Sequence, residues 1–306
     1  MKIAHLSDLH FTTFFNKNNL QEIDFALSFV TKNKIDHLVI TGDLTDNASP
    51  QDFEILRNLF KKHNLLDGER LSIVIGNHDI FGGVQTAEDI FNFPAKCRSI
   101  DFNKKIIEFY DYFNETFRNC VYIQPERIFP YAKILSGILL IGLNSISEYS
   151  KTKNIFASNG SIKYDQLFEL IHIFNDYKNN YQSIIILTHH HFNKIKVDKN
   201  SSSNNFWQKI EKQTMKLRKK ERIINFFKAY NVDLVMHGHY HENKKYIRKG
   251  IKFLTAGGSF MGSTLSKIKI NIVTLNSKDL KCEILTLQRN TDILDHRNIS
   301  LTFTGT

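Results

Sequence analysis

The chain has few cysteines and lacks long apolar runs. Its 306 residues include Cys97, Cys120 and Cys282, an odd number of widely spaced thiols. This pattern excludes a disulfide framework and a zinc ribbon, and it fits a reducing compartment. No apolar run approaches the ~18 residues that a membrane-spanning helix needs. We therefore expect a protein without a transmembrane segment.

The amino-terminal segment shows no sign of a secretory leader. A leader needs a basic end and an apolar region ahead of a cleavage site, yet a polar cluster with functional character begins at Asp8. Removal of a leader would remove that cluster, so we expect a cytoplasmic protein. With 42% hydrophobic and 24% charged residues, the chain is long enough for one large domain with a deep core.

Short apolar runs alternate with amphipathic helical patterns along the chain. The runs are rich in β-branched residues and show little polar alternation, which is typical of strands buried on both faces. The helical patterns space their apolar residues by three and four. The runs cover residues 2–7, 37–41, 71–75, 183–188 and 232–236. This order of strand, helix and strand predicts an α/β fold.

Five polar clusters follow these apolar runs and contain carboxylates, imidazoles and one amide. The carboxyl ends of strands in α/β sheets border the ligand crevice, so we expect the clusters to converge. Their ligand mixture suits Mn, Fe or Zn. Two ions ~3.5–4 Å apart need a shared anionic ligand, and Asp43 is the candidate. The clusters are Asp8-Leu9-His10, Gly42-Asp43, Gly76-Asn77-His78-Asp79, His189-His190-His191 and Gly238-His239-Tyr240-His241.

Read in order, these blocks are D-x-H, GD, GNHD, H and GHxH, and with them the chain resembles the calcineurin-like metallophosphoesterases. D-x-H or GD alone occurs by chance in many chains, whereas five blocks in order argue against coincidence. The compact chain is most similar to the small bacterial branch, which contains phosphodiesterases of the cyclic-nucleotide and glycerophosphodiester type. The resemblance implies a four-layer α/β/β/α sandwich, in which helices flank two mixed sheets.

The resemblance also implies the ligands of two divalent ions, which would be Mn²⁺, Fe²⁺/Fe³⁺ or Zn²⁺. Within the histidine block, His189 is favoured because it directly follows the apolar run. His190 and His191 remain alternatives, since Phe192 stands where the family often has proline. The implied ligands are Asp8, His10 and His241 for the first ion, Asn77, His189 and His239 for the second, and Asp43 as the bridge.

The implied reaction is an in-line attack on phosphorus by a metal-activated hydroxide. His78 would lie close to the substrate phosphate, where it would stabilise the transition state or protonate the leaving alkoxide. Asp46, which follows Asp43 by three positions, is the candidate that orients the His78 imidazole. Asp79 is the alternative for that role.

The leading interpretation is a metal-dependent phosphoesterase acting on a small phosphate ester, with a phosphodiester favoured over a phosphomonoester. The alternative is a nuclease or a nucleotide-lipid pyrophosphatase on the same fold. The net charge of +10 and the basic stretch from Lys209 to Arg222 favour a polyanion, although a solvated helix face is the favoured interpretation of that stretch. Nucleic acid is not the favoured partner, because no long extra domain is seen after Gly262. A complete ligand set disfavours a non-catalytic scaffold.

We expect a phosphoesterase domain over residues 1–288 and a carboxyl-terminal tail over 289–306. The segments 80–131 and 192–215 look like additions to the core that form substrate-side excursions or a lid. The first has an aromatic helical stripe, and packing against the sheet is its simplest interpretation. Strand-like runs between 133 and 143 and between 244 and 287 indicate a second sheet packed on the first.

Overall fold

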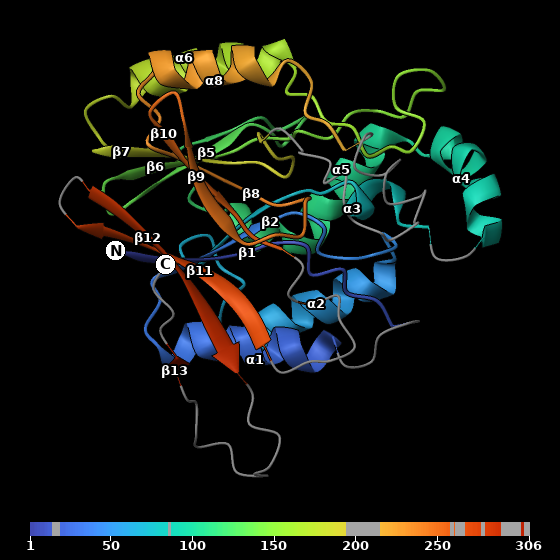
Figure 1. The fold of residues 1–306 in the computed structure, drawn as a ribbon, viewed down its shortest axis with the longest axis horizontal. Coiled ribbons are helices and arrows are strands. Elements are labelled where there is room, and N and C mark those ends of the chain that lie inside the picture. The colour runs from blue at the N-terminus through green and yellow to red at the C-terminus, as the bar shows by residue number, and fades with distance from the viewer. Residues whose placement is uncertain are drawn as a thin grey trace, which may run out of the picture.

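The computed structural model describes residues 1–13, 19–84, 87–193, 215–257, 260, 267–276, 279–288 and 301–302. Two β-sheets lie between two layers of helices, as Figure 1 shows. The lower helices are α1 (Asn19–Lys32) and α2 (Pro50–Lys62), and the upper ones are α6 (Tyr164–Asp176) and α8 (Lys220–Ala229). The predicted four-layer sandwich is confirmed.

The first sheet combines three parallel strands with a carboxyl-terminal hairpin. Its order is β13-β12-β11-β1-β2-β3, and β11 runs antiparallel to β1. The expectation that the strands of residues 267–288 belong to the second sheet was wrong. They pair with the open edge of β1, and a local apolar pattern cannot indicate which sheet edge a hairpin will join. The strands are β1 (Lys2–Leu6), β2 (His37–Thr41), β3 (Leu71–Val74), β11 (Lys267–Asn276), β12 (Asp279–Gln288) and β13 (Leu301–Thr302).

The second sheet has the order β4-β5-β6-β7-β8-β10-β9. Its four central strands, β6, β7, β8 and β10, run parallel, while β5 and β9 pair antiparallel with them at either side. The strands bearing the polar clusters are therefore divided between the two sheets. The strands are β4 (Tyr122–Ile123), β5 (Tyr131–Leu135), β6 (Ile138–Gly142), β7 (Ser183–Leu187), β8 (Leu234–His237), β9 (Lys244–Arg248) and β10 (Ile251–Thr255).

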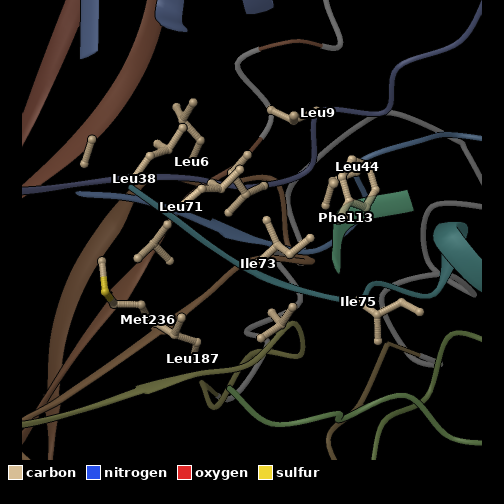
Figure 2. Close-up of a cluster of buried hydrophobic side chains, with 14 of the residues drawn as sticks. Leu6, Leu9, Leu38, Leu44, Leu71, Ile73, Ile75, Phe113, Leu187 and Met236 are labelled. Carbon is tan, nitrogen blue, oxygen red and sulfur yellow. The ribbon is translucent and has the colours of Figure 1, made fainter. Parts of the chain in front are cut away.

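Apolar side chains fill the space on both faces of the second sheet. Leu187 and Met236 point into the core between the sheets, which also contains Leu38 of β2 (Figure 2). The neighbouring residues Ile186 and Val235 point the other way and belong to the cluster beneath α6 and α8. Because successive side chains of a strand face opposite sides, strands covered on both sides need the uninterrupted apolar runs seen in the sequence.

The described residues between β3 and β5 form three helices, a 3₁₀ turn and the short strand β4. The helices and the turn are α3 (His78–Phe81), α4 (Ala87–Ser99), α5 (Phe102–Phe113) and η1 (Asn114–Phe117). The aromatic stripe of α5 is core, since Phe109 and Phe113 are fully buried and Phe113 packs on Phe53 and Phe60 of α2. Helix α4 lies at the right edge of Figure 1. Among the described residues, no helix has the length and apolar character needed to cross a bilayer.

A buried lysine joins β5 of the second sheet to the first sheet. Lys133 of β5 is 1% exposed, and burial lowers its pKa to about 8. Such a group is stable inside a protein only when its polar atoms are satisfied. Its Nζ donates to the carbonyl oxygens of Gly68 at 2.8 Å, Leu71 at 2.9 Å and Thr116 at 2.5 Å, and lies 3.0 Å from Ser72 Oγ.

Candidate metal centre

The predicted ligands converge where parallel strands of the two sheets end. Asp8 and His10 follow β1, Asp43 follows β2, and Asn77 follows β3. The remaining ligands come from the second sheet, with His189 after β7 and His239 and His241 after β8. Each of these seven side chains lies within 3.7 Å of another member of the set.

The first group comprises Asp8, His10 and His241. His10 Nε2 lies 3.1 Å from His241 Nε2, and His241 Nε2 lies 3.5 Å from Asp8 Oδ1. Both oxygens of Asp8 also accept from the backbone N–H of His239, at 3.0 and 3.1 Å. This carboxylate therefore connects the end of β1 to the end of β8. One carboxylate and two imidazoles together offer a divalent cation three donor atoms.

The second group comprises Asn77, His189 and His239. His189 Nε2 lies 3.1 Å from Asn77 Oδ1 and 3.0 Å from His239 Nδ1. Both imidazoles are buried, with His189 at 0% and His239 at 1% exposure. An amide oxygen and two imidazole nitrogens therefore face one another in a largely buried site.

Asp43 lies between the two groups. Its Oδ2 is 3.2 Å from His189 Nε2 of the second group and 3.7 Å from His10 Nε2 of the first. Its other oxygen, Oδ1, accepts from the backbone N–H of His78 at 2.8 Å. A single carboxylate oxygen thus faces both clusters, which is the arrangement that a bridging ligand requires.

The outward ring nitrogens of three histidines donate to the protein. His189 Nδ1 lies 2.8 Å from the Thr41 carbonyl oxygen, His239 Nε2 3.2 Å from that of Ser158, and His10 Nδ1 3.1 Å from Asp46 Oδ1. The tautomers assigned from this network leave lone pairs on the inward nitrogens. The inward nitrogens of His189 and His239 then face each other at 3.0 Å and would repel unless a proton or a metal ion lies between them. The donor set therefore fits a bound metal.

The charge distribution around Asp43 supports the same interpretation. Burial alone would raise the pKa of Asp43, but His189 and His78 outweigh burial and hold it well below its usual range. Burial opposes the charged form of His189, yet Asp43 raises its pKa to about 9. Burial lowers the pKa of His239 well below its usual value. The buried carboxylate thus demands positive charge beside it, which protons or metal ions can provide.

Asp46 is the carboxylate beside His78. Asp46 Oδ1 lies 3.0 Å from His78 Nδ1 and 3.1 Å from His10 Nδ1, so it orients both rings. Asp79 instead accepts from the backbone N–H groups of Thr45 and Gly76, each at 2.9 Å. It therefore holds the loops after β2 and β3 together. The geometry favours Asp46 over Asp79 as the partner of His78.

The contacts of the three adjacent histidines distinguish them from one another. His190 Nδ1 lies 2.9 Å from Ser145 Oγ, and its Nε2 lies 3.1 Å from the Ser158 carbonyl oxygen. His191 Nε2 lies 2.9 Å from the carbonyl oxygen of Met215. Both rings are thus engaged with protein groups away from the carboxylates. Within the block, the geometry favours His189 as the ligand.

The backbone at the centre is held in an uncommon conformation. Five of the predicted ligands have left-handed φ values, and such strain in non-glycine residues persists where a site requires it. Two motif glycines leave room for the carboxylates. A Cβ atom at Gly238 would lie 2.5 Å from Asp8 Oδ2, and one at Gly76 would collide with Asp43 Oδ1. The φ values are 54° at Asp8, 44° at His10, 49° at Asp43, 71° at His239 and 51° at His241.

A cavity of about 300 Å³ adjoins the centre. Its polar lining includes Asn77, His78 and His241, while Ile90 and Phe156 contribute to its apolar wall. Sequence reasoning did not assign these two apolar residues to the site, because isolated apolar residues carry no motif. The carbonyl oxygen of Ser158, which accepts from His239, was also missed, because a backbone carbonyl outside a motif gives no signal in the sequence.

The basic stretch lies only partly within the described residues. Lys209 and Lys212 lie outside them. Lys219 Nζ and Arg222 Nη1 donate to the Tyr164 hydroxyl at 3.1 and 2.6 Å. None of the described basic residues of this stretch lines the cavity.

Comparisons with known proteins bear on the family and the fold. A sequence model of calcineurin-like phosphoesterases matches residues 1–243. A dimetal phosphatase from Danio rerio has a similar fold, with a TM-score of 0.59 and 10% identity over 93% of this chain and 94% of that one. A purple acid phosphatase from yellow lupin seeds has a TM-score of 0.50 and 14% identity, over 94% and 49% of the two chains. At these identities the likeness shows the fold alone.

One curated relative is similar over part of the chain. It is a component of the SbcCD nuclease of Escherichia coli K12, and it is 29% identical over 99 residues. The matched part is 30% of this chain and spans only 25% of the relative.

Proposed function

This chain belongs to the calcineurin-like phosphoesterase family, and we propose that it hydrolyses a phosphate ester at a dinuclear metal centre. The position of Asp43 Oδ2, which faces His10 of one group and His189 of the other, supports this proposal most directly. Buried carboxylates and facing imidazole lone pairs serve metal binding, whereas a scaffold would gain nothing from them.

The proposed ligand sets are those that the resemblance implied. Asp8, His10 and His241 would hold one ion, Asn77, His189 and His239 the other, and Asp43 both. Oxygen and nitrogen donors without thiolate suit Mn²⁺, Fe²⁺/Fe³⁺ or Zn²⁺. When bound, two such ions would polarise the phosphoryl oxygen and lower the pKa of water toward neutrality.

His78 would act on the leaving group. Its Nδ1 donates to Asp46, which leaves Nε2 to hold a proton for the departing alkoxide. Burial alone would lower the pKa of His78, but Asp43 and Asp46 outweigh burial and raise it to about 10. Its side chain is 25% exposed, against 2% for Asp43, so His78 is accessible to a substrate. Asp46 would act as a positioning residue, because it holds the ring through Nδ1.

The preferred substrate in this proposal is a small phosphodiester. The cavity beside the centre leaves room for a second esterified group, which a monoester does not have. We assign catalysis to a domain of residues 1–288, in which the 80–131 excursion contributes α4 to the cavity wall. Most of the 192–215 excursion and of the 289–306 tail lies outside the described residues. The three cysteines are unpaired, which supports work in a reducing cytoplasm.

Cleavage of nucleic acid is the second candidate. The similarity to the nuclease component over 99 residues favours it. The described residues of the basic stretch do not line the cavity, so the structure offers less support for this candidate than for a small ester.

The test is hydrolysis by chelator-stripped protein that is refilled separately with Mn²⁺, Zn²⁺ or Fe²⁺. Bis(p-nitrophenyl) phosphate and p-nitrophenyl phosphate report diester and monoester cleavage, and labelled single- and double-stranded DNA report nuclease activity. We expect metal-restored cleavage of the diester above that of the monoester. Faster turnover of DNA would support the second candidate, and no hydrolysis with any metal would contradict the proposal.

A further inference from the structure

We propose that the ester hydrolysed here carries an alkyl or aryl group, which occupies the cavity between the metal centre and α4. This inference rests on the proposed function and specifies its substrate class. It is supported by the composition of the cavity, by the position of the apolar wall relative to His78, and by the cavity volume.

The cavity is polar at one end and apolar over the rest of its surface. The polar end consists of metal-ligand candidates, His78 and Ser158. Among the described lining residues, no charged side chain lies outside that end. The apolar wall comprises Val84, Ile90, Phe93, Pro94, Phe156 and Met215.

The apolar wall begins directly beside His78. The Gly82-Gly83 turn follows α3, and a Cβ atom at Gly83 would lie 2.8 Å from His78 Cε1. The next residue, Val84, already belongs to the cavity wall and is 40% exposed. A phosphoryl group held at the metal ligands would therefore direct a substituent from the polar end toward α4.

The cavity volume suits a substituent of several carbon atoms. About 300 Å³ corresponds to roughly ten water molecules at the volume each occupies in the liquid. Transfer of one methylene from water to such a surface improves binding about fourfold. A polyanion would gain little from this wall, because its charged groups would lose water without finding partners there.

Helix α4 provides a matched pair of residues for a test. Ile90 lines the cavity and is half-buried, whereas its neighbour Phe91 is 84% exposed and does not line it. Both positions lie in the same turn of one helix, so replacing either by serine changes helix propensity to a similar extent. A difference between Ile90→Ser and Phe91→Ser therefore reports the cavity rather than the helix.

The experiment is titration calorimetry of Mn²⁺-loaded protein with methyl-, butyl-, hexyl- and octylphosphonate, which are not hydrolysed. We expect affinity to rise about fourfold for each methylene until the cavity is filled. Ile90→Ser should weaken octylphosphonate binding about tenfold and leave methylphosphonate binding unchanged. Phe91→Ser should match the wild type for both ligands. Val84→Ser replaces Ile90→Ser as the test variant if the latter fails to fold.

Three results would overturn the inference. They are an affinity that does not change with chain length, an equal effect of Ile90→Ser and Phe91→Ser, and tighter binding of a nucleoside monophosphate than of octylphosphonate. Hydrolysis of methyl p-nitrophenyl phosphate by the same protein is measured in parallel. If this ester is hydrolysed but affinity is flat, the inference fails and the proposed function stands. Chain-length dependence without hydrolysis would show a site for an apolar ligand, but it would contradict the proposed function and with it the inference.

Discussion

At the scale of single residues, Asp43 has the most specific geometry in the centre. Its Oδ1 is fixed by the backbone of His78, while Oδ2 faces His189 and His10. The position after a Gly at the end of an apolar strand made Asp43 a candidate from the sequence. The two different tasks of its oxygens could not be predicted, because they depend on where β3 and β7 end in space.

We predict that Asp43→Asn abolishes metal-dependent hydrolysis without unfolding the protein. The amide keeps the shape of the side chain but loses the negative charge that both metal groups share. Initial rates with the chromogenic diester and circular dichroism measure the two effects. Asp176→Asn, at an exposed position of α6, is the matched control and should retain wild-type activity; full activity of Asp43→Asn would refute the bridging role.

His78→Ala should behave differently from a ligand substitution. Because His78 would act on the leaving group, we expect the variant to retain its metals and to lose about 10²–10⁴ in kcat. Metal analysis by mass spectrometry and steady-state kinetics distinguish the two effects. If the variant loses its metals instead, His78 is a ligand and not an acid.

Other residue assignments differed in how far the sequence could predict them. The sequence left His189, His190 and His191 open, because all three are adjacent in one block. Only folding shows that His190 and His191 turn toward Ser145 and Met215. Asp46 and Asp79 were also open, and their hydrogen-bond partners in three dimensions distinguish them.

At the scale of elements, the buried Lys133 of β5 links the two sheets. Its ammonium bonds to carbonyl oxygens near β3 and to Ser72. A single lysine between apolar strand residues gives no sign in the sequence that it points into the core. Its role depends on the position of β3, which lies far from β5 in the chain.

We predict that Lys133 makes stability depend on pH in a defined direction. Its folded pKa is lowered by burial to about 8 from the ordinary value of 10.5. Below pH 8 both states hold the proton and stability does not vary with this group. Between about pH 8 and 10.5 the unfolded chain binds more protons, so the free energy of unfolding rises with pH.

Denaturant unfolding of wild type and Lys133→Met at pH 7.5 to 10 measures this effect. Burial raises the pKa of the nearby Cys120 to about 11, which gives the opposite pH trend, so the difference between the two proteins is the quantity to compare. The free energy of unfolding of wild type minus that of Lys133→Met should increase by at most about 1 kcal/mol per pH unit above pH 8. A difference that stays constant or falls would show that Lys133 is not buried as a cation.

The strands show which features of an element can be predicted from the sequence: their presence can, whereas the sheet that they join cannot. Continuous apolar runs predicted the central strands, because burial on both faces leaves a local signal. The sheet to which β11 and β12 belong was predicted wrongly, since the edges of β1 and of the second sheet offer the same backbone partners. The contribution of α4 to the cavity was not predicted, as its apolar residues fit core packing equally well.

At the scale of the whole molecule, the candidate centre lies across the junction of the two sheets. Asp8, His10, Asp43 and Asn77 come from the first sheet, while His189, His239 and His241 come from the second. The ligand residues are near one another only in the folded chain. The family motifs predicted the fold class, because the order of the blocks reflects the strand ends that the site requires.

Metal binding should therefore stabilise the entire fold. An ion that binds only the folded state adds about 2.7 kcal/mol when present at 100 times its Kd, which corresponds to a rise in Tm of roughly 4 °C for a chain of 306 residues. Differential scanning calorimetry of Mn²⁺-loaded and chelator-treated protein measures the shift. Asp43→Asn should show a smaller shift, and equal shifts in both proteins would argue against binding at this centre.

The most direct test of the account is the number of metal ions bound per chain. Chelator-stripped protein is dialysed against Mn²⁺, and its metal content is measured by mass spectrometry for wild type and Asp43→Asn. The dinuclear centre predicts two ions per wild-type chain and fewer in the variant. One ion or none in wild type, or two ions retained by Asp43→Asn, would contradict a centre bridged by Asp43.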